Sequence, residues 1–263
     1  MKNVLITGAS HGIGAAAALA FGREGYNVGL NYFQSKDGAE DTAKRIREFG
    51  VEAEIFYADV SSHDMCRDML TRFIERFGKI DVLVNNAGGA LKMPEGGFEQ
   101  MPMEYWDSQI NLNLNAAAYC SRYAVQDMIQ KGTHGKIINI SSVHSQITYV
   151  RRKALPYCAA KAGLNMFTKS LGVEVIKHGI NVNCIAPGLV FTKLANRYSK
   201  EDLESFSRKI PFGNGGMAED ITPLILFLAD DSKSRFIVGQ TFVVDGGQSI
   251  DGAIESMEWR DSI

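Results

Sequence analysis

The stretch Thr7-Gly8-Ala9-Ser10-His11-Gly12-Ile13-Gly14 decides the fold of this chain. A short apolar strand (3–7) is predicted to run into it, and an alanine-rich helix (15–24) to follow it. Glycine permits a positive φ and a close approach to an anion, while the free N–H groups at a helix start attract phosphate. The spacing G-x-x-x-G-x-G differs from the general G-x-G-x-x-G dinucleotide fingerprint. The order strand, glycine turn, helix predicts a dinucleotide phosphate site, and the alternative is a tight turn without a ligand.

Apolar strands and amphipathic helices alternate along the rest of the chain. The predicted strands are 27–32, 52–57, 80–84, 136–140, 180–186 and 241–244. The predicted helices are 37–49 (starting at 37 or 38), 62–77, 103–131, 156–178 and 219–229. Strands that alternate with helices favour an α/β protein with a parallel sheet.

The composition fits a globular protein of moderate size. The 263 residues (28.9 kDa) correspond to one well-buried domain, 1–263. A net charge of -2 and a pI near 6.2 predict no binding to nucleic acid or to an anionic membrane. No apolar stretch approaches the ~20 residues of a membrane helix and no secretion leader is visible, so a cytoplasmic location is expected. The four cysteines lack metal-ligand spacing, which predicts reduced thiols and no metal site.

The end of the second predicted strand bears on the choice of coenzyme. An Asp or Glu near this point hydrogen bonds the adenosine ribose of NAD, but Asn31-Tyr32-Phe33 offers no carboxylate. Lys36, with His11 or Ser10 from the glycine turn, could meet a 2′-phosphate, although the usual arginine is missing. NADP(H) is therefore slightly favoured over NAD(H), and the alternative for Lys36 is a solvated surface position.

Two further strand ends carry small or polar residues. Asp59, after the third strand, could accept the adenine amino group or could cap the next turn, and both interpretations stay open. Asn85-Asn86-Ala87-Gly88 ends the fourth strand and leaves room for a flat ligand, and the loop 88–97 would wall a substrate cleft.

In the helix 103–131, Asn111, Asn113 and Asn115 are poor helix formers. One of them could hold a water in a proton path, or they could bond neighbouring backbone.

The reaction chemistry is predicted from the stretch Asn139-Ile140-Ser141-Ser142 and from Tyr157 and Lys161. Tyr157 and Lys161 are separated by four residues on a predicted helix, which places the ammonium within reach of the phenol. A nearby cation lowers the pKa of a tyrosine by about 1–3 units toward the range in which a general acid or base works. The upper end of that range is needed at neutral pH, so a second positive charge would help, and an oxidised nicotinamide ring could supply it. Taken alone, such a pair is also common on helix surfaces.

Three segments without a firm role complete the chain. The loop 143–155 carries Arg151-Arg152-Lys153, which could attract an acidic substrate or could simply be solvated. The segment 189–212 has the length and polarity of a lid over the cleft, and 202–209 within it could be helical. The tail 248–263 carries no chemical motif and could be a terminal arm on a partner subunit or loose chain.

Six separated motifs occur in the order found in the short-chain dehydrogenase/reductase family, which the chain resembles over nearly its whole length. The motifs are Thr7-Gly8-x-x-x-Gly12-x-Gly14, Asp59-Val60, Asn85-Asn86-Ala87-Gly88, Asn113-Leu114, the trio Ser142, Tyr157 and Lys161, and Pro187-Gly188 with Val190 and Thr192. The resemblance implies a Rossmann-type doubly wound fold with a seven-stranded parallel sheet, strand order 3-2-1-4-5-6-7, flanked by helices on both faces. The alternation of elements supports such a fold but does not order its strands.

The resemblance also implies a role for each motif. Tyr157 would exchange the proton with the substrate oxygen and Ser142 would steady that oxygen. Lys161 would bind the nicotinamide ribose and lower the tyrosine pKa, and Asn113 would hold the relay water. With Tyr32 and Lys36 from the strand end, the expected coenzyme contacts besides Tyr157 and Lys161 are Gly8, Ser10, His11, Gly12, Ile13, Gly14, Tyr32, Lys36, Asp59, Val60, Asn86, Ala87, Gly88, Pro187, Gly188, Val190 and Thr192.

The expected activity is interconversion of a secondary alcohol and a ketone by hydride transfer. Ser141-Ser142-Val143-His144 resembles bacterial glucose and polyol dehydrogenases, and the general layout equally resembles 3-oxoacyl-carrier-protein reductases. The gap between Ser142 and Tyr157 is about two residues longer than is usual in the family. The alternative is a non-catalytic dinucleotide sensor, which has no need of the four residues Asn113, Ser142, Tyr157 and Lys161 together. The family resemblance and apolar positions off the core face of the Tyr157 helix suggest a homotetramer.

Overall fold

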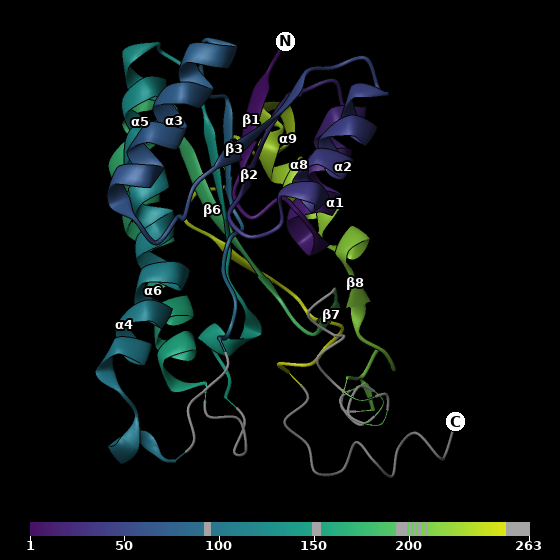
Figure 1. Cartoon of the computed structure of the whole chain (residues 1–263), viewed down its shortest axis with the longest axis vertical. Helices are drawn as coiled ribbons and strands as arrows, with labels where there is room; N and C mark the ends of the chain where they lie inside the picture. The colour runs from purple at the N-terminus through teal and green to yellow at the C-terminus, as the bar shows by residue number, and fades with distance from the viewer. Residues whose placement is uncertain are drawn as a thin grey trace.

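A computed structural model describes residues 1–91, 96–148, 154–192 and 210–250, together with the single positions 199, 201, 204, 207 and 208. Its centre is a seven-stranded sheet in which every neighbouring pair is parallel and the order is β3-β2-β1-β4-β5-β6-β9 (Figure 1). The strands are β1 Asn3–Ile6, β2 Asn27–Tyr32, β3 Ala53–Tyr57, β4 Val82–Asn85, β5 Lys136–Ile140, β6 Asn181–Pro187 and β9 Thr241–Val244. The predicted order 3-2-1-4-5-6-7 is thus confirmed, with β9 as the seventh strand.

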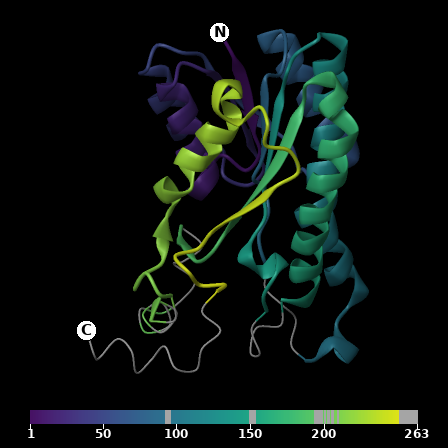
Figure 2. The same cartoon turned by 180° about the vertical axis from the view of Figure 1, so that it is seen from behind.

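Helices cover both faces of the sheet. One layer contains α3 (His63–Phe77), α5 (Ala116–Gln130) and α6 (Leu155–Val175), with α4 (Met103–Ile110) continuing toward the lower end in Figure 1. The other contains α1 (Gly12–Arg23), α2 (Lys36–Arg47), α8 (Thr222–Ala229) and α9 (Asp231–Ser234), and Figure 2 shows the same two layers from behind. None of the helices in the described ranges is long and apolar enough to cross a membrane.

The two layers are explained by the burial of the strands. All residues of β1, β4, β5 and β6 are buried, as expected for a parallel sheet covered on both faces, while the edge strands β3 and β9 are partly exposed. Successive side chains of a strand point to opposite faces. Leu5 accordingly packs in the core cluster with Phe73 of α3, whereas Ile6 packs in the other cluster with Phe21 of α1.

The structure departs from the predicted elements in three places. The predicted helix 103–131 is interrupted by a π-helical turn, Asn111–Asn115, at the three asparagines. The Tyr157 helix ends at Val175 and passes into a 3₁₀ turn, Ile176–His178. The last long helix begins at Thr222, after a 3₁₀ turn at Ala218–Asp220.

The predicted lid is described mainly at its two ends. Val190–Phe191 (β7) pairs in parallel with Gly216–Met217 (β8), so the start of the segment is joined to the chain that follows it. Phe212 N–H donates to the Gly246 carbonyl at 3.0 Å, which ties the other end to the turn after β9. The cationic stretch 151–153, most of 193–209 and the tail from 251 onward lie outside the described residues.

Candidate active site

The glycine turn joins β1 to α1 at the carboxyl end of the sheet, where open α/β sheets bind ligands. Gly8 and Gly12 have φ values of +64° and +59°, which favour glycine. A Cβ on Gly14 would collide with the Gly8 carbonyl oxygen and lie 2.5 Å from Asn86 Nδ2. The first N–H groups of α1 have no partner within the helix. The turn therefore has the close packing and the free donors that a pyrophosphate requires.

Thr7 and Asn86 hold this turn against the end of β4. Thr7 Oγ1 accepts from the N–H groups of Asn86 (3.0 Å) and Ala87 (2.9 Å). Asn86 Nδ2 donates to the carbonyl oxygens of Thr7 (2.9 Å) and Gly8 (3.1 Å). A Cβ on Gly8 would come within 2.9 Å of Ala87 Cα. The glycine motif and the motif at 85–88 are thus one structural unit.

At the end of β2, Asn31 is buried and supports the glycine turn from the side. Its Oδ1 accepts from Gly8 N–H at 3.1 Å, and its Nδ2 donates to the Ala58 carbonyl at 3.0 Å. Tyr32 is half-buried, with its ring centroid 5.6 Å from that of Tyr57. Asn31 therefore links β2 to both the glycine turn and the end of β3.

The start of α2 lies on the glycine turn. Ser10 Oγ donates to the Ser35 carbonyl at 2.9 Å, and a Cβ on Gly38 would lie 2.8 Å from the Ser10 carbonyl and 3.5 Å from His11 Nδ1. Lys36 is the first residue of this helix, and both it and His11 are exposed. The structure therefore brings Ser10, His11 and Lys36 to one edge of the expected coenzyme site.

Asp59 caps the turn before α3. Its Oδ1 accepts from both the N–H (2.9 Å) and the Oγ (2.7 Å) of Ser61. Of the two interpretations left open by the sequence, the capping contact is present. The side chain of Val60 is buried in the core, so a coenzyme contact there would use its backbone.

The predicted catalytic residues meet at the start of α6. Pro156 lies in the first turn of the helix, where its missing N–H costs nothing. Ser142 follows β5 and is buried, and its side chain lies close enough to Tyr157 to lower the pKa of the phenol. Ser142 Oγ accepts from His144 N–H at 3.2 Å, which leaves its own proton to donate. The His144 and Tyr157 rings lie edge to face, with centroids 5.9 Å apart.

Lys161 is buried directly behind the tyrosine. Its Nζ donates to the Ile140 carbonyl at 2.8 Å and lies 5.8 Å from the centre of the Tyr157 ring. A Cβ on Gly88 would lie 3.3 Å from the same Nζ and 2.8 Å from Asn113 Oδ1. The hydroxyl, phenol, ammonium and amide predicted from distant motifs therefore surround one point at the end of the sheet.

Burial shifts the pKa of both groups on α6. It lowers the pKa of Lys161 to about 8, because a buried ammonium loses its hydration. It also raises the pKa of Tyr157 above its ordinary value, and the hydrogen bond with Ser142 only partly opposes this. In the protein alone the pKa of Tyr157 is therefore raised rather than lowered, because desolvation is the largest influence on it.

Asn113 lies in the π-helical turn and binds the start of the loop 88–97. Its Oδ1 accepts from Gly89 N–H at 2.8 Å, and its Nδ2 donates to the Gly89 carbonyl and to the Gln109 carbonyl, each at 3.1 Å. Asn115 Nδ2 donates to Asn111 Oδ1 at 2.6 Å. Only the bond to the Gln109 carbonyl corresponds to the predicted alternative of bonding to neighbouring backbone, whereas the bonds to Gly89 place the side chain of Asn113 beside Gly88.

The segment after β6 closes the site from the other side. Pro187 ends the strand, and Gly188 N–H donates to the Val244 carbonyl at 2.9 Å. Thr192 packs against the glycine turn, since a Cβ on Gly12 would lie 3.1 Å from its Cγ2. Val190 is half-buried in β7. The predicted nicotinamide-side residues are thus brought to the phosphate turn.

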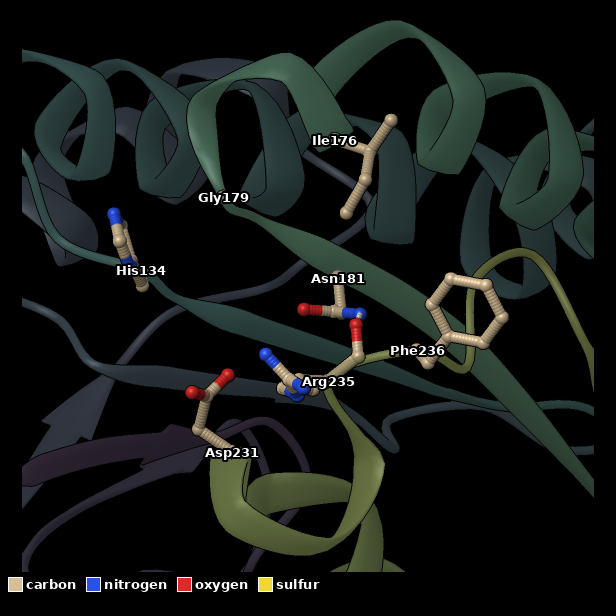
Figure 3. Close-up of a pocket in the computed structure, with 7 residues that line it drawn as sticks. All are labelled: His134, Ile176, Gly179, Asn181, Asp231, Arg235 and Phe236. Carbon is tan, nitrogen blue, oxygen red and sulfur yellow. Dashed lines mark hydrogen bonds between the residues drawn. The ribbon is translucent and has the colours of Figure 1, made fainter.

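A separate cavity of about 460 Å³ lies at the opposite end of the sheet (Figure 3). It is lined by His134, Ile176, Gly179, Asn181, Asp231, Arg235 and Phe236. Asn181 is the first residue of β6, whereas the predicted catalytic residues follow the last residues of the strands. None of the predicted site residues lines this cavity. In the described ranges, no group of three or more His, Cys, Asp or Glu side chains is arranged to hold a metal ion.

Sequence reasoning named Asn85 and Asn139 but did not predict that they support the site from behind. Asn85 Nδ2 donates to Asn139 Oδ1 at 2.8 Å, and Asn139 Nδ2 donates to Thr168 Oγ1 at 2.9 Å, which links β4, β5 and α6. Asn31 has the comparable role at the glycine turn. The available signal was a polar residue within an otherwise apolar strand, because a buried amide requires a partner.

The fold and this site define a Rossmann-type, dinucleotide-dependent oxidoreductase. Residues 8–249 match the family model described as enoyl-(acyl carrier protein) reductase. The chain is 37% identical to 3-oxoacyl-[acyl-carrier-protein] reductase FabG of Staphylococcus aureus over 246 residues, covering 94% of this chain and 97% of that protein.

Solved structures are similar over the same length. A short-chain type dehydrogenase/reductase from Mycobacterium marinum superposes with a TM-score of 0.87 at 32% identity, covering 94% of this chain and 95% of that one. A single-residue variant of actinorhodin polyketide ketoreductase, solved with NADPH, gives 0.85 at 30% identity, with 94% and 97% covered. The chain belongs to the short-chain dehydrogenase/reductase family. It is an NAD(P)-dependent oxidoreductase that acts on a small molecule.

Proposed function

We propose that the protein interconverts a secondary alcohol and a ketone, with Tyr157 as the general acid and base. The observation that carries this proposal is the meeting of Ser142, Tyr157 and Lys161 at the end of β5. The bound coenzyme supplies or accepts the hydride. Ser142 donates a hydrogen bond to the substrate oxygen, and Tyr157 gives that oxygen a proton in reduction or removes it in oxidation.

Lys161 and Asn113 complete the proposed proton-transfer site. A protonated Lys161 donates to the ribose hydroxyls of the coenzyme and stabilises the phenolate of Tyr157. Asn113 anchors Gly89 and holds a relay water on the side of Gly88. The positive charge of the oxidised nicotinamide ring offsets the burial that raises the tyrosine pKa. The phenolate is therefore favoured when the coenzyme is bound.

The glycine turn, the strand ends and the segment after β6 fit the coenzyme. The N–H groups of Gly12, Ile13 and Gly14 would hold the pyrophosphate. Asp59 and the backbone of Val60 would contact the adenine, and Asn86, Ala87 and Gly88 would contact the ribose. Residues 187–192 would contact the carboxamide of the nicotinamide ring.

NADP(H) is the proposed coenzyme because the end of β2, Asn31-Tyr32-Phe33, offers no carboxylate and the cation Lys36 begins α2. Ser10, His11 and Lys36 converge there, and the polyketide ketoreductase relative was solved with NADPH. Titration of NADPH and NADH, followed by coenzyme fluorescence, tests this choice. Lys36→Ala should weaken NADPH binding several-fold and leave NADH binding unchanged. Equal affinity for both coenzymes in the wild type would refute the preference.

The proposed substrate is a 3-oxoacyl thioester, as the name of the Staphylococcus aureus relative indicates. A sugar or polyol is the second candidate, because the half-buried His144 lies edge-on to Tyr157 and offers a polar ring beside the reacting oxygen. A panel of 3-oxoacyl thioesters, sugars and polyols, assayed with both coenzymes in both directions, separates the two. Inactivity on every member would contradict the assignment of an alcohol or ketone substrate.

A homotetramer is proposed as the active assembly. Ala159, Met166 and Val173 are exposed apolar residues spaced seven apart on α6, so they form one stripe on the helix. Met166 and Val173 are 60% and 75% exposed, which is unusual for the middle of a long helix. Exposed apolar side chains that recur on one face of a helix are typical of a subunit interface.

A further inference from the structure

Helix α6 contacts the segment after β5 at intervals of four residues. Tyr157, Lys161 and Asn165 therefore lie on one face of the helix. Tyr157 lies close enough to Ser142 for that hydroxyl to lower its pKa, and Lys161 Nζ donates to the Ile140 carbonyl at 2.8 Å. The third residue, Asn165, has no part in the reaction proposed above, yet it faces the same segment.

Asn165 is bonded to Ser142 through one intermediate hydroxyl. Asn165 Nδ2 donates to Ser145 Oγ at 2.8 Å, and Ser145 Oγ donates to the Ser142 carbonyl at 2.6 Å. Cys184 Sγ donates to Asn165 Oδ1 at 3.5 Å, which directs the amide oxygen toward β6 and the amide nitrogen toward Ser145. Because a hydroxyl has one proton, this chain of bonds runs in one direction, from Asn165 to Ser142.

The other contacts of Ser142 within its turn are local. Ser145 N–H donates to the Ser142 carbonyl at 2.9 Å, and His144 N–H donates to Ser142 Oγ at 3.2 Å. These bonds shape the turn but do not set its position relative to α6. The residues before Ser142 are tied to α6 by Ser141 Oγ, which donates to the Lys161 carbonyl at 3.2 Å, and by Lys161 Nζ. The turn that begins at Ser142 is tied to α6 by Asn165 through Ser145. A reacting group must be held to within about 0.5 Å for productive geometry, so such a bond has consequences for rate.

We propose that Asn165, acting through Ser145, is a positioning residue that holds Ser142 in register with Tyr157, so that both hydroxyls face one substrate oxygen. This inference rests on the function proposed above. Helix α6 thereby positions Ser142, in addition to carrying the phenol of Tyr157 and the ammonium of Lys161. A purely structural bond would stabilise the fold without a specific effect on the step that uses Ser142.

Three substitutions test the chain of bonds. Asn165→Asp keeps the shape but removes the donor, and the Ser145 hydroxyl then donates to the new carboxylate instead of to Ser142. Ser145→Ala removes the relay without adding a charge, and Ser145→Thr keeps the hydroxyl. We expect kcat to fall about 3- to 10-fold in the first two variants, the effect of one hydrogen bond, and to stay within about 2-fold in the third. Coenzyme affinity should be unchanged in all three.

The background of Ser142→Ala distinguishes positioning from general stabilisation. If Asn165 acts through Ser142, Ser145→Ala should change kcat by less than about 1.5-fold once Ser142 has no hydroxyl. The matched control is Ser234→Ala in α9, outside the candidate active site, which removes the hydrogen bonds of a buried hydroxyl to the Leu228 and Asp230 carbonyls. It should lower the melting temperature and leave kcat unchanged.

The pH profile gives a second test. The Ser142 bond lowers the pKa of Tyr157, so loosening it should move the profile of kcat for alcohol oxidation to higher pH in Ser145→Ala. Unchanged kcat and an unchanged profile in Asn165→Asp and Ser145→Ala would overturn the proposal, as would an equal loss in the Ser142→Ala background.

Crystal structures of the wild type and of Ser145→Ala test the positioning role of Asn165 independently of the proposed function. If the wild type is inactive on every carbonyl substrate, the proposed function is wrong, but the positioning role is still testable. The distance between Ser142 Oγ and the Tyr157 hydroxyl should lengthen in Ser145→Ala relative to the wild type. An unchanged distance would overturn the positioning role by itself.

Discussion

At the scale of single residues, burial decides the charge of the candidate active site before a coenzyme binds. It raises the pKa of Tyr157 and lowers that of Lys161, so each shift favours the neutral side chain. The spacing of four residues predicted their proximity, because helix geometry fixes it. It did not predict how deeply they are buried, which depends on helices and strands far away in the sequence.

Tyr157→Phe tests the role of the phenol. The substitution removes one oxygen and keeps the ring, so we expect coenzyme affinity to be retained while kcat falls by about 10²- to 10⁴-fold, the usual contribution of general acid and base catalysis. Steady-state kinetics and coenzyme fluorescence titration measure the two effects. Cys158→Ala, at the neighbouring half-buried position, is the control and should keep kcat within about 3-fold. A non-catalytic dinucleotide sensor would show no turnover in either variant.

The pKa of Lys161 has a consequence for stability. Between pH 8 and 10.5 the unfolded chain keeps a proton on this lysine that the folded protein has lost. Folding is therefore linked to proton release, and the contribution of Lys161 becomes less unfavourable as pH rises through this window. Compared with Lys161→Met, the wild type should gain about 2 kcal/mol in free energy of unfolding between about pH 8 and pH 10. Urea denaturation at each pH measures the difference.

The comparison with Lys161→Met isolates the lysine from other buried groups that titrate in the same window. The raised pKa of Tyr157 shifts the stability of both proteins in the same direction, opposite to that of Lys161. Because Lys161 lowers the raised pKa of the Cys184 thiol, both proteins carry Cys184→Ala in this comparison. If the difference in free energy of unfolding between the wild type and Lys161→Met does not change with pH, the lysine is not desolvated in the folded protein.

At the scale of elements, local patterns predicted the strands and most helices, since apolar periodicity and glycine positions are local properties. The π-helical turn at Asn111–Asn115 was not predicted, although three asparagines drew attention to it. It is stabilised by Asn113 bonds to Gly89, a contact between segments 24 residues apart. The pairing of β7 with β8 was also missed, because strands of two residues are too short to show an apolar periodicity.

Gly14→Ala tests the close packing of the glycine turn. Alanine is the better helix former by about 1 kcal/mol, so a free helix would gain stability. The new Cβ, however, would lie 2.5 Å from Asn86 Nδ2 and would collide with the Gly8 carbonyl, both held by other bonds. We expect a net loss of about 2 kcal/mol or more in free energy of unfolding and at least about 10-fold weaker coenzyme binding.

Gly25→Ala is the matched control for this substitution. Gly25 follows the same helix at φ +79°, and a Cβ added there would have no heavy atom within 4 Å. Its cost is therefore about 1 kcal/mol of backbone strain alone. Its coenzyme affinity should be unchanged. Gly14→Ala with wild-type affinity and stability would show that the turn can widen freely.

At the scale of the whole molecule, the alternation of elements indicated the α/β class but not the strand order. The order was inferred from the family resemblance, because many topologies satisfy the same alternation. The meeting of Ser142 with Tyr157 and Lys161 was likewise implied by the family resemblance, whereas helix spacing predicted only that Tyr157 and Lys161 lie close together. The buried links from Asn85 to Asn139 and from Asn165 to Ser145 could not be predicted, since they depend on the register between α6 and the sheet.

The apolar stripe on α6 makes a prediction about assembly. Met166 and Val173 are seven residues apart and strongly exposed, so two copies of α6 can pack along these positions. Glutamate at both positions would place like charges in that contact at a cost of several kcal/mol, which outweighs the small effect of surface charges on folding. We expect Met166→Glu/Val173→Glu to fall apart into smaller species at micromolar concentration and to keep its far-ultraviolet circular dichroism.

Multi-angle light scattering after size exclusion measures this change. Thr71→Glu, an exposed substitution on α3, is the control and should keep the wild-type mass. A wild-type protein that elutes as a monomer at micromolar concentration would refute the tetramer. If the double variant keeps the wild-type mass, the subunit interface does not lie at these positions of α6. Because α6 also carries Tyr157 and Lys161, loss of the assembly should lower kcat together with the mass if subunit packing holds the helix in place.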